Sequence, residues 1–256
     1  MVDTVPVEIG FYQQFNRIFY QITARAARFR YYDYSTISSL GLPGSSRDRF
    51  EYGETLRIGY QMFEDLDVFV APSLRQIHYI ETINAAGQAR DSNGMNVSLG
   101  ATWRINPISI VEGSAGYQSA SYATGLGNTA AWAFGLAGTW TGYAPLTLRP
   151  YISRSINESA LSNYKNFVST TFAVDYNYVI HDAWTLSGGL LYMIADYSPI
   201  DGSGVPPRTD YFFRGQIGLL YSLRPEVQIG PFFEYVKATS TDSTGPTYDR
   251  LFFPSG

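Results

Sequence analysis

Apolar and polar residues alternate with a period of two along most of the chain. From Met95 to Ile105 the apolar side chains fall on one face, and small polar side chains fall on the other. The same split recurs from Thr55 to Met62 and from Val168 to Tyr178. This alternation is typical of strands with one face in an apolar environment, and no segment sustains the three-to-four-residue spacing of an amphipathic helix. The pattern predicts an all-β protein.

Turn-forming residues divide the pattern into about twelve strands, which we assign to one domain spanning residues 1–256. The strands cover roughly 5–15, 18–33, 50–62, 67–80, 93–105, 108–122, 129–141, 146–157, 165–179, 184–197, 210–223 and 227–239. Most are longer than the about five or six residues of a globular sheet, and their length suits a tilted crossing of a bilayer by about 9–11 residues with some overhang. We therefore predict an antiparallel, up-and-down transmembrane β-barrel.

The connections between these strands alternate in size. Short turns such as Asn106-Pro107 alternate with longer polar connections, including Tyr34 to Arg49, Glu81 to Ser92 and Ser198 to Thr209. Bacterial outer-membrane barrels have short periplasmic turns and longer extracellular loops. The alternation therefore predicts a periplasmic end at the short turns and an outer end at the long connections.

Aromatic residues gather near both ends of the predicted strands, where the interfaces of a membrane would lie. Those near the short turns are Phe15, Phe63, Trp103, Trp140, Tyr143, Trp184 and Tyr221. Those near the long connections are Tyr32, Tyr52, Tyr79, Tyr122, Tyr197 and Tyr211. We predict two aromatic belts that face the lipid.

Composition narrows the class further. Charged residues make up 16% of the chain and aromatic residues another 16%, whereas a soluble domain has about 25% charged residues. The longest apolar run, Ala130 to Gly138, is far shorter than the roughly 20 residues of a membrane-spanning helix. The absence of cysteine excludes disulfides and thiolate metal sites. An acidic pI of about 5.2 without basic runs argues against binding of nucleic acid.

The start of the sequence, MVDTVPVEIGFYQQF, lacks the features of a secretory signal. For an exported protein it is therefore mature sequence or a fragment. The first predicted strand begins, and the last one finishes, at the outer end, whereas an even-stranded barrel has both termini in the periplasm. Either the chain is a segment of a larger barrel, or the ends 1–4 and 240–256 fold back. We favour the segment, with the tail from Tyr248 to Phe253 beginning another strand.

Several short motifs occur in a recognisable order. They are Arg30-Tyr31-Tyr32-Asp33-Tyr34, Arg90-Asp91-Ser92-Asn93-Gly94, Gly116-Tyr117-Gln118, Ala144-Pro145-Leu146-Thr147, Ser153-Arg154-Ser155-Ile156-Asn157-Glu158 and Arg208-Thr209-Asp210-Tyr211. Over about residues 18–240 the chain resembles the second putative beta-barrel porin family, outer-membrane proteins often encoded beside exopolysaccharide export genes. The resemblance implies a barrel that conducts capsular polysaccharide or exopolysaccharide beside a periplasmic polysaccharide-export protein. It implies no catalytic residues.

The residues opposite the apolar faces would line the lumen of such a barrel. The candidates are Arg25, Arg57, Arg75, Arg104, Arg149, Arg214, Asp175, Glu112, Glu234 and Tyr151. Rings of arginine select anions in pores, and a planar guanidinium matches a carboxylate or phosphate. We expect a passive channel for acidic exopolysaccharide or other anionic solutes. In an alternative interpretation, the arginines pair with carboxylates and fill a narrow barrel. Tyr151 would then pack against the wall instead of stacking on a sugar.

Three other functions compete with a channel. The first is a closed structural or binding barrel of the outer membrane. The second is a lipid-modifying barrel enzyme centred on His78, for which no serine is clearly placed. The third is a soluble β-sandwich, which predicts shorter strands. Carboxylates such as Asp65, Asp67 and Asp91 fall in predicted turns without the spacing of a calcium loop. We therefore predict no enzyme activity, no metal and no cofactor.

Overall fold

A computed structural model describes residues 2–32, 47–81, 89–122, 126–143, 145–159, 161, 163–181, 183–224, 227–243 and 245–252. Within these described residues, fourteen strands form the sheet. They are β1 (Val2–Phe15), β2 (Ile18–Tyr31), β3 (Arg49–Gln61), β4 (Leu66–Tyr79), β5 (Ser92–Asn106), β6 (Ser109–Tyr122), β7 (Asn128–Tyr143), β8 (Leu146–Glu158), β9 (Tyr164–His181), β10 (Trp184–Pro199), β11 (Arg208–Arg224), β12 (Val227–Ile229), β13 (Phe232–Ser240) and β14 (Tyr248–Phe252).

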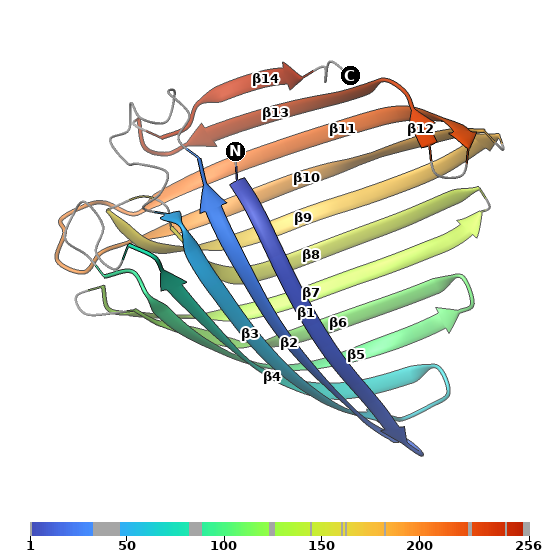
Figure 1. Cartoon of the computed structure of the whole chain (residues 1–256), viewed down its shortest axis with the longest axis horizontal. Coiled ribbons are helices and arrows are strands. Elements are labelled where there is room, and N and C mark those ends of the chain that lie inside the picture. Colours follow the sequence, from blue (N-terminus) through green and yellow to red (C-terminus); the bar gives the residue numbers. More distant parts are fainter. Residues whose placement is uncertain are drawn as a thin grey trace.

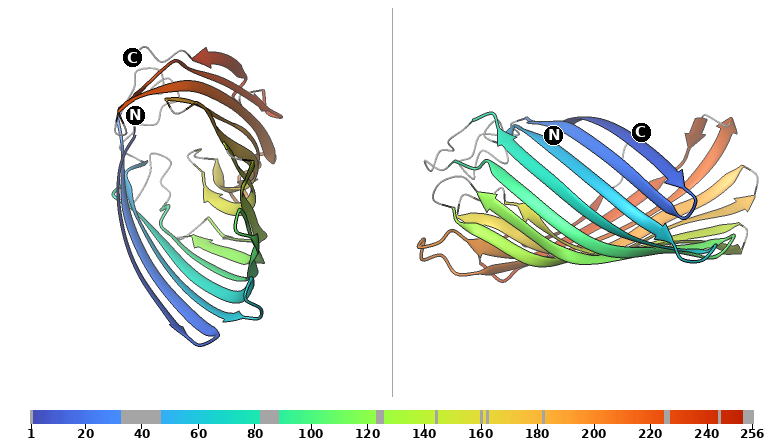
Figure 2. Two further views of the ribbon diagram at one scale, coloured as in Figure 1. Left: turned by 90° about the vertical axis from the view of Figure 1, so that its right-hand side faces the viewer. Right: turned by 90° about the horizontal axis from the view of Figure 1, so that it is seen from below.

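The strands form one antiparallel sheet in which sequence neighbours pair, with β13 following β11 and the short β12 beside β11 (Figure 1). The sheet curves into an open, barrel-like shell (Figure 2). Its two edge strands are β1 and β14, and no ladder joins them in the part of the chain that the structure describes. No described helix is long and apolar enough to cross a membrane.

The prediction of an all-β, up-and-down architecture is confirmed, and each predicted strand is present. One strand differs, because the segment predicted at 227–239 is broken at Gly230 and Pro231 into β12 and β13. Proline lacks the N–H that a ladder needs. At Gly230 an added Cβ would lie 1.8 Å from the carbonyl oxygen of Leu219, so the break depends on glycine. The tail from Tyr248 forms β14, as expected.

The connections also follow the predicted alternation. Short turns join β1 to β2, β3 to β4 and β5 to β6. Asn16 in the first of these has a φ of 55°, a left-handed conformation that asparagine tolerates. Much of the long connections at 33–46 and 82–88 lies outside the described residues. We call the end with these turns the short-turn end, and the opposite end the outer end.

The convex face carries the large apolar side chains. Ile9, Leu99 and Trp132 are 72%, 69% and 70% exposed, respectively. Exposed apolar residues on every second position of long strands are expected where lipid covers the sheet. The short-turn belt is present as exposed Phe15, Phe63, Trp103, Trp140 and Trp184, whereas the side chain of Tyr143 lies outside the described residues.

The outer belt is only partly as predicted. Tyr32 and Tyr52 are exposed, and Tyr211 pairs in register with Ile194 of the convex face. Three other members, Tyr79, Tyr122 and Tyr197, share the parity of the concave face. Tyr79 is only 1% exposed. The prediction that they face lipid is wrong, because the strand period at their positions directs the ring inward.

Candidate pore-lining surface

The ladders place all ten predicted lining residues on the concave face. One continuous row of cross-strand partners runs from Thr102 through Glu112, Ala137, Tyr151, Ala173 and Leu191 to Arg214. A second row runs from Arg149 through Asp175, Gly189 and Gln216 to Glu234. Arg25, Gly53 and Arg75 form a third on β2, β3 and β4. Their role in lining a pore stays a prediction.

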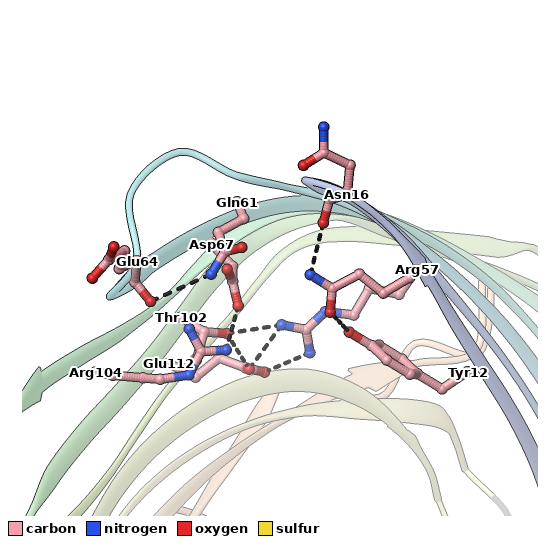
Figure 3. A network of polar contacts seen from close by, with 10 residues as sticks. Tyr12, Asn16, Arg57, Gln61, Glu64, Asp67, Thr102, Arg104 and Glu112 are labelled. Carbon is pink, nitrogen blue, oxygen red and sulfur yellow. Dashed lines mark hydrogen bonds and ion pairs between the residues drawn. The ribbon is translucent and has the colours of Figure 1, made fainter. Parts of the chain in front are cut away.

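Contacts between distant strands identify this face as concave. Arg57 on β3 binds Glu112 on β6, although β4 and β5 lie between them. Neighbouring strands are about 4.8 Å apart, so three steps along a flat sheet would exceed the length of these side chains. The curvature brings the two groups together (Figure 3).

Arg57 is the centre of a cluster near the short-turn end. Its Nη2 donates hydrogen bonds to Glu112 Oε2 (2.9 Å) and to Thr102 Oγ1 (2.8 Å), and Nη1 donates to Glu112 Oε1 (3.3 Å). The Thr102 hydroxyl donates to Glu112 Oε2 (2.6 Å). The guanidinium also lies 3.5 Å from the ring centroid of Phe69. Arg57 is therefore held by charge, by hydrogen bonds and by a ring.

Glycine positions the ring beneath Arg57. A Cβ added to Gly100 would lie 2.3 Å from the Phe69 ring. The neighbouring ring of Phe19 covers Gly59 in the same way, at 2.1 Å. Aromatic side chains that cover glycines pin the register of a sheet. The sequence thus builds a platform of two rings under the guanidinium.

A second ion pair lies beside this cluster. Arg104 Nη2 binds Asp67 Oδ2 at 2.5 Å. Asp67 is the second residue of β4 and is buried, so the predicted strand at 67–80, which begins with Asp67, is confirmed and the placement of its carboxylate in a turn was wrong. Asp67 lies an even number of positions from Phe69 and Arg75 on the same strand, so the alternation of the strand predicts that its side chain also points to the concave face. Figure 3 also shows peripheral hydrogen bonds, including that of Gln61 to the Glu64 carbonyl.

Arg75 belongs to a third group, toward the outer end. Its Nη2 binds Glu51 Oε2 at 2.8 Å, and Arg49 Nε binds the other oxygen of Glu51, also at 2.8 Å. Arg49 also lies over the ring of Phe29 at 4.7 Å. Neither Arg49 nor Glu51 was among the predicted residues, although both share the parity of Arg57.

The other three predicted arginines are different. In the described part of the chain, Arg25, Arg149 and Arg214 take part in no ion pair or hydrogen bond. Their carboxylate neighbours in the ladders, Glu8 beside Arg25 and Asp175 beside Arg149, make no ion pair with them. The guanidinium groups of these three arginines remain available to a solute.

The charges that the described ladders place on the concave face are more balanced than the predicted set. All basic residues that the ladders place there are arginines. They are Arg25, Arg49, Arg57, Arg75, Arg104, Arg149, Arg208, Arg214 and Arg250, against Glu8, Glu51, Asp67, Glu112, Asp175, Asp210 and Glu234. These nine positive and seven negative groups leave an excess of two positive charges. The predicted set of six arginines and three carboxylates had an excess of three.

Small polar side chains occupy the space between these charges. A cavity of about 320 Å³ on the concave face is lined by residues of β4 to β8, among them Ser73, Arg75, Asn96, Gln118 and Ser153. The inward residues of β7 here are Ala133 and Gly135. Hydroxyl and amide groups on a hollow wall suit a hydrated polar solute.

His78, the centre of the alternative lipid-modifying enzyme, lies at the outer rim. His78 Nδ1 lies 2.6 Å from Asp91 Oδ2, and the His78 side chain is 62% exposed. Its cross-strand partner on β3 is Phe50, and no serine forms a hydrogen bond with it among the described residues. At the same rim the Tyr32 hydroxyl donates to Asp3 (2.7 Å), and this bond raises the pKa of Tyr32. No group of potential metal ligands occurs in the described segments.

Comparisons with known proteins identify the family. The family described as Putative beta-barrel porin 2 matches residues 1–251. A search of curated proteins found no match. Among solved structures, the FrpB iron transporter from Neisseria meningitidis is similar with a TM-score of 0.49 and 6% identity, over 93% of this chain and 43% of the transporter chain. The chain thus spans less than half the length of that transporter. The chain is an outer-membrane, porin-like β-barrel protein and belongs to the family Putative beta-barrel porin 2.

Proposed function

We propose that the protein is a passive channel for anionic solutes, with acidic exopolysaccharide as the cargo and a periplasmic polysaccharide-export protein as its partner at the short-turn end. One observation carries this proposal. Arg25, Arg149 and Arg214 face the concave side without a carboxylate partner among the described residues. Unpaired guanidinium groups on a pore wall attract anions and bind carboxylates through two parallel hydrogen bonds.

The neutral part of the wall supports a carbohydrate cargo. Ser73, Asn96, Gln118 and Ser153 around the cavity offer hydroxyl and amide groups, which can exchange hydrogen bonds with sugar hydroxyls as a chain slides. Tyr151 lies on the same face, in the row of Arg214. Small side chains also leave room for a hydrated polymer.

The test is ion selectivity in a planar bilayer under a potassium chloride gradient. The variant Arg25→Gln/Arg149→Gln/Arg214→Gln removes three charges from the concave face. The control Arg28→Gln/Arg30→Gln/Lys237→Gln removes three from positions of the convex parity. We expect an anion-selective current that loses its preference in the first variant and keeps it in the control. A folded protein without current, or with a cation preference, would contradict the proposal.

A second arm tests the cargo. We expect oligomers of galacturonic acid to interrupt the current in the wild-type protein, because their carboxylates can bind the unpaired arginines. Maltodextrin of the same length serves as the neutral control. Equal interruption of the current by both sugars would contradict the proposed preference for acidic polysaccharide but not the proposed channel.

One observation favours the alternative of a closed barrel. At the outer end, Ser159, the residue after β8, is only 2% exposed, and its carbonyl oxygen accepts a hydrogen bond from Arg90 beside β5. A permanent contact there would seal the lumen, and the protein would then serve as a structural or binding barrel. The conductance measurement separates the two functions.

A further inference from the structure

The wall of the shell is interrupted between β7 and β8. Only six residue pairs join these strands, whereas thirteen join β6 to β7 and thirteen join β8 to β9. Toward the outer end the ladder stops at Phe134 and Arg154. Among the described residues, the outer part of β7, Asn128–Ala133, therefore has no ladder partner on β8.

The outer end of the β8–β9 hairpin lies inside the shell instead. We call its described arms, Ser155–Ser159 and Tyr164–Val168, the flap. The N–H of Ile156 donates to Oε1 of Gln118 (3.0 Å), although Gln118 belongs to β6, beyond β7. The side chain of Ile156 is buried in a cluster with Ala120 and Val168. The flap therefore covers the concave face of β6 and β7.

The sequence of β7 makes this position possible. Its inward residues from 131 to 137 are alanine or glycine, and Ala131 packs against the Ile156 cluster. Larger side chains at these positions would fill the space that the flap occupies. The same small residues leave the lumen open when the flap is elsewhere.

Polar contacts hold the flap to β5 and β7 and to the residues just before β5; we call them the latch. Ser92 Oγ on β5 donates to Glu158 Oε1 (2.9 Å). Asn166 Nδ2 donates to Thr129 Oγ1 on β7 (2.6 Å), and Asn166 is 0% exposed. Arg90, two residues before β5, donates to the carbonyl oxygen of Ser159. These contacts hold the flap across the outer end of the lumen.

We propose that the flap is a gate, with one position inside the lumen and one in the wall. In the second position β8 continues its ladder with β7 in the register of Phe134 and Arg154, so that position 131 pairs with 157. Pairing satisfies backbone groups whose exposure to lipid is costly, whereas the latch and the Ile156 cluster favour the inner position. The ladder between the β9 arm and β10 is kept in both positions, and the exchange of the latch for the ladder with β7 makes a two-state transition feasible.

This gate rests on the proposed channel function, because only a conducting lumen is regulated by closing it. The cysteine-free chain allows each position to be trapped by a disulfide. Thr129→Cys/Asn166→Cys joins the flap to β7 at the present 2.6 Å hydrogen bond. Asn177→Cys/Ser187→Cys joins paired residues in the regular part of the β9–β10 ladder and is the control.

We expect oxidation of the Thr129 and Asn166 pair to lower the conductance at least fivefold and reductant to restore it. The control pair should oxidise without a change in current. Equal conductance of the oxidised and reduced Thr129 and Asn166 variant would overturn the gate, because a flap locked inside would then leave the lumen open.

A second variant, Ala131→Cys/Asn157→Cys, tests the wall position. In the present structure the Asn157 side chain donates to Ser169 Oγ (2.8 Å) on the lumenal face of the flap, away from Ala131. A disulfide at this pair therefore reports that β8 has joined β7. We expect the disulfide to form and to hold the current at its open level.

The two crosslinks separate failure of the gate from failure of the channel. If the wild-type protein carries no current, the channel proposal fails. Disulfide formation at both pairs, followed by gel mobility, would then still support two flap positions. A disulfide at Thr129 and Asn166 alone would overturn them, whether or not the protein conducts.

Discussion

Two arginines near the short-turn end of the concave face, Arg57 on β3 and Arg149 on β8, have opposite surroundings. Arg57 has a carboxylate three strands away at bonding distance and an aromatic ring beneath it. Arg149 has Asp175 directly across the ladder but forms no ion pair with it in the described structure. A shared face therefore does not imply a shared role: Arg57 acts as a brace, and Arg149 is free to meet a solute.

Packing explains the difference. The two rings that cover Gly59 and Gly100 narrow the space around Arg57 and fix its side chain. In the rows of Arg149 and Arg214, the neighbours across the ladders include Gly189 and Leu191, which offer no platform. The paired arginines on β3, β4 and β5 fit the filled-barrel interpretation, whereas Arg149 and Arg214 fit the open one.

The largest effect is expected from Arg57→Ala. Removal of the guanidinium leaves Glu112 and Thr102 without their common partner, while Glu112 is 43% exposed. Water therefore compensates part of the loss, and we expect the free energy of unfolding to fall by about 2 kcal/mol, between the values for exposed and buried pairs. Urea unfolding in phospholipid vesicles measures this change.

Arg149→Ala is the matched control, because it removes the same side chain from the same face. An exposed residue without partners should change the free energy of unfolding by no more than about 0.5 kcal/mol. Equal losses in the two variants would show that the Arg57 cluster contributes nothing special to stability.

Gly100→Ala should have the next largest effect. The added Cβ would meet the Phe69 ring at 2.3 Å and the carbonyl oxygen of Gly113 at 2.7 Å, so the ring must leave its place under Arg57. We expect a loss of about 1–2 kcal/mol, as for other overpacked sites. Gly53→Ala is the control, since its nearest neighbour would be 3.8 Å away. A comparable loss of stability in Gly53→Ala would mean that replacing a strand glycine is itself destabilising, without a contribution from the Phe69 ring.

The sequence predicts the faces of this molecule better than its contacts. Period-two alternation establishes each strand and the parity of Arg57 or Arg149, because neighbouring residues in a strand must point to opposite sides. It cannot reveal that Glu112 reaches Arg57, since that contact depends on the curvature of four strands. It also misses the interruption between β7 and β8, because both strands keep their alternation where they separate. The alternation of β4 also predicts that Tyr79 points inward, on the side of Arg75. The prediction of a lipid-facing ring instead followed the position of Tyr79 at a strand end.

A smaller effect is expected at the second ion pair. Arg104→Ala leaves Asp67 buried without its cation, but Arg104 itself is 45% exposed, and water can approach the carboxylate. We expect the free energy of unfolding to fall by about 1 kcal/mol. Arg104→Ala/Asp67→Ala also removes the unpaired carboxylate. Its free energy of unfolding should therefore fall by less than the sum of the losses in the two single variants. Additive losses would mean that the two residues are not coupled.

The smallest change is expected from Arg149→Lys, which keeps the charge but removes the planar guanidinium. Stability should not change, because Arg149 has no described partner to lose, and the reversal potential should stay the same because selectivity follows charge. The interruption of current by galacturonic acid oligomers should nevertheless shorten several-fold, since an ammonium group cannot form two parallel bonds to a carboxylate. Single-channel recording of the blocked time measures this effect, and Arg57→Lys is the comparison. There the lysine would lose its bonds to Glu112 and Thr102, so stability should fall while the blocked time stays constant. If the blocked time instead shortened at Arg57 and not at Arg149, the carboxylates would bind the braced arginine, and the distinction between the two regions would be reversed.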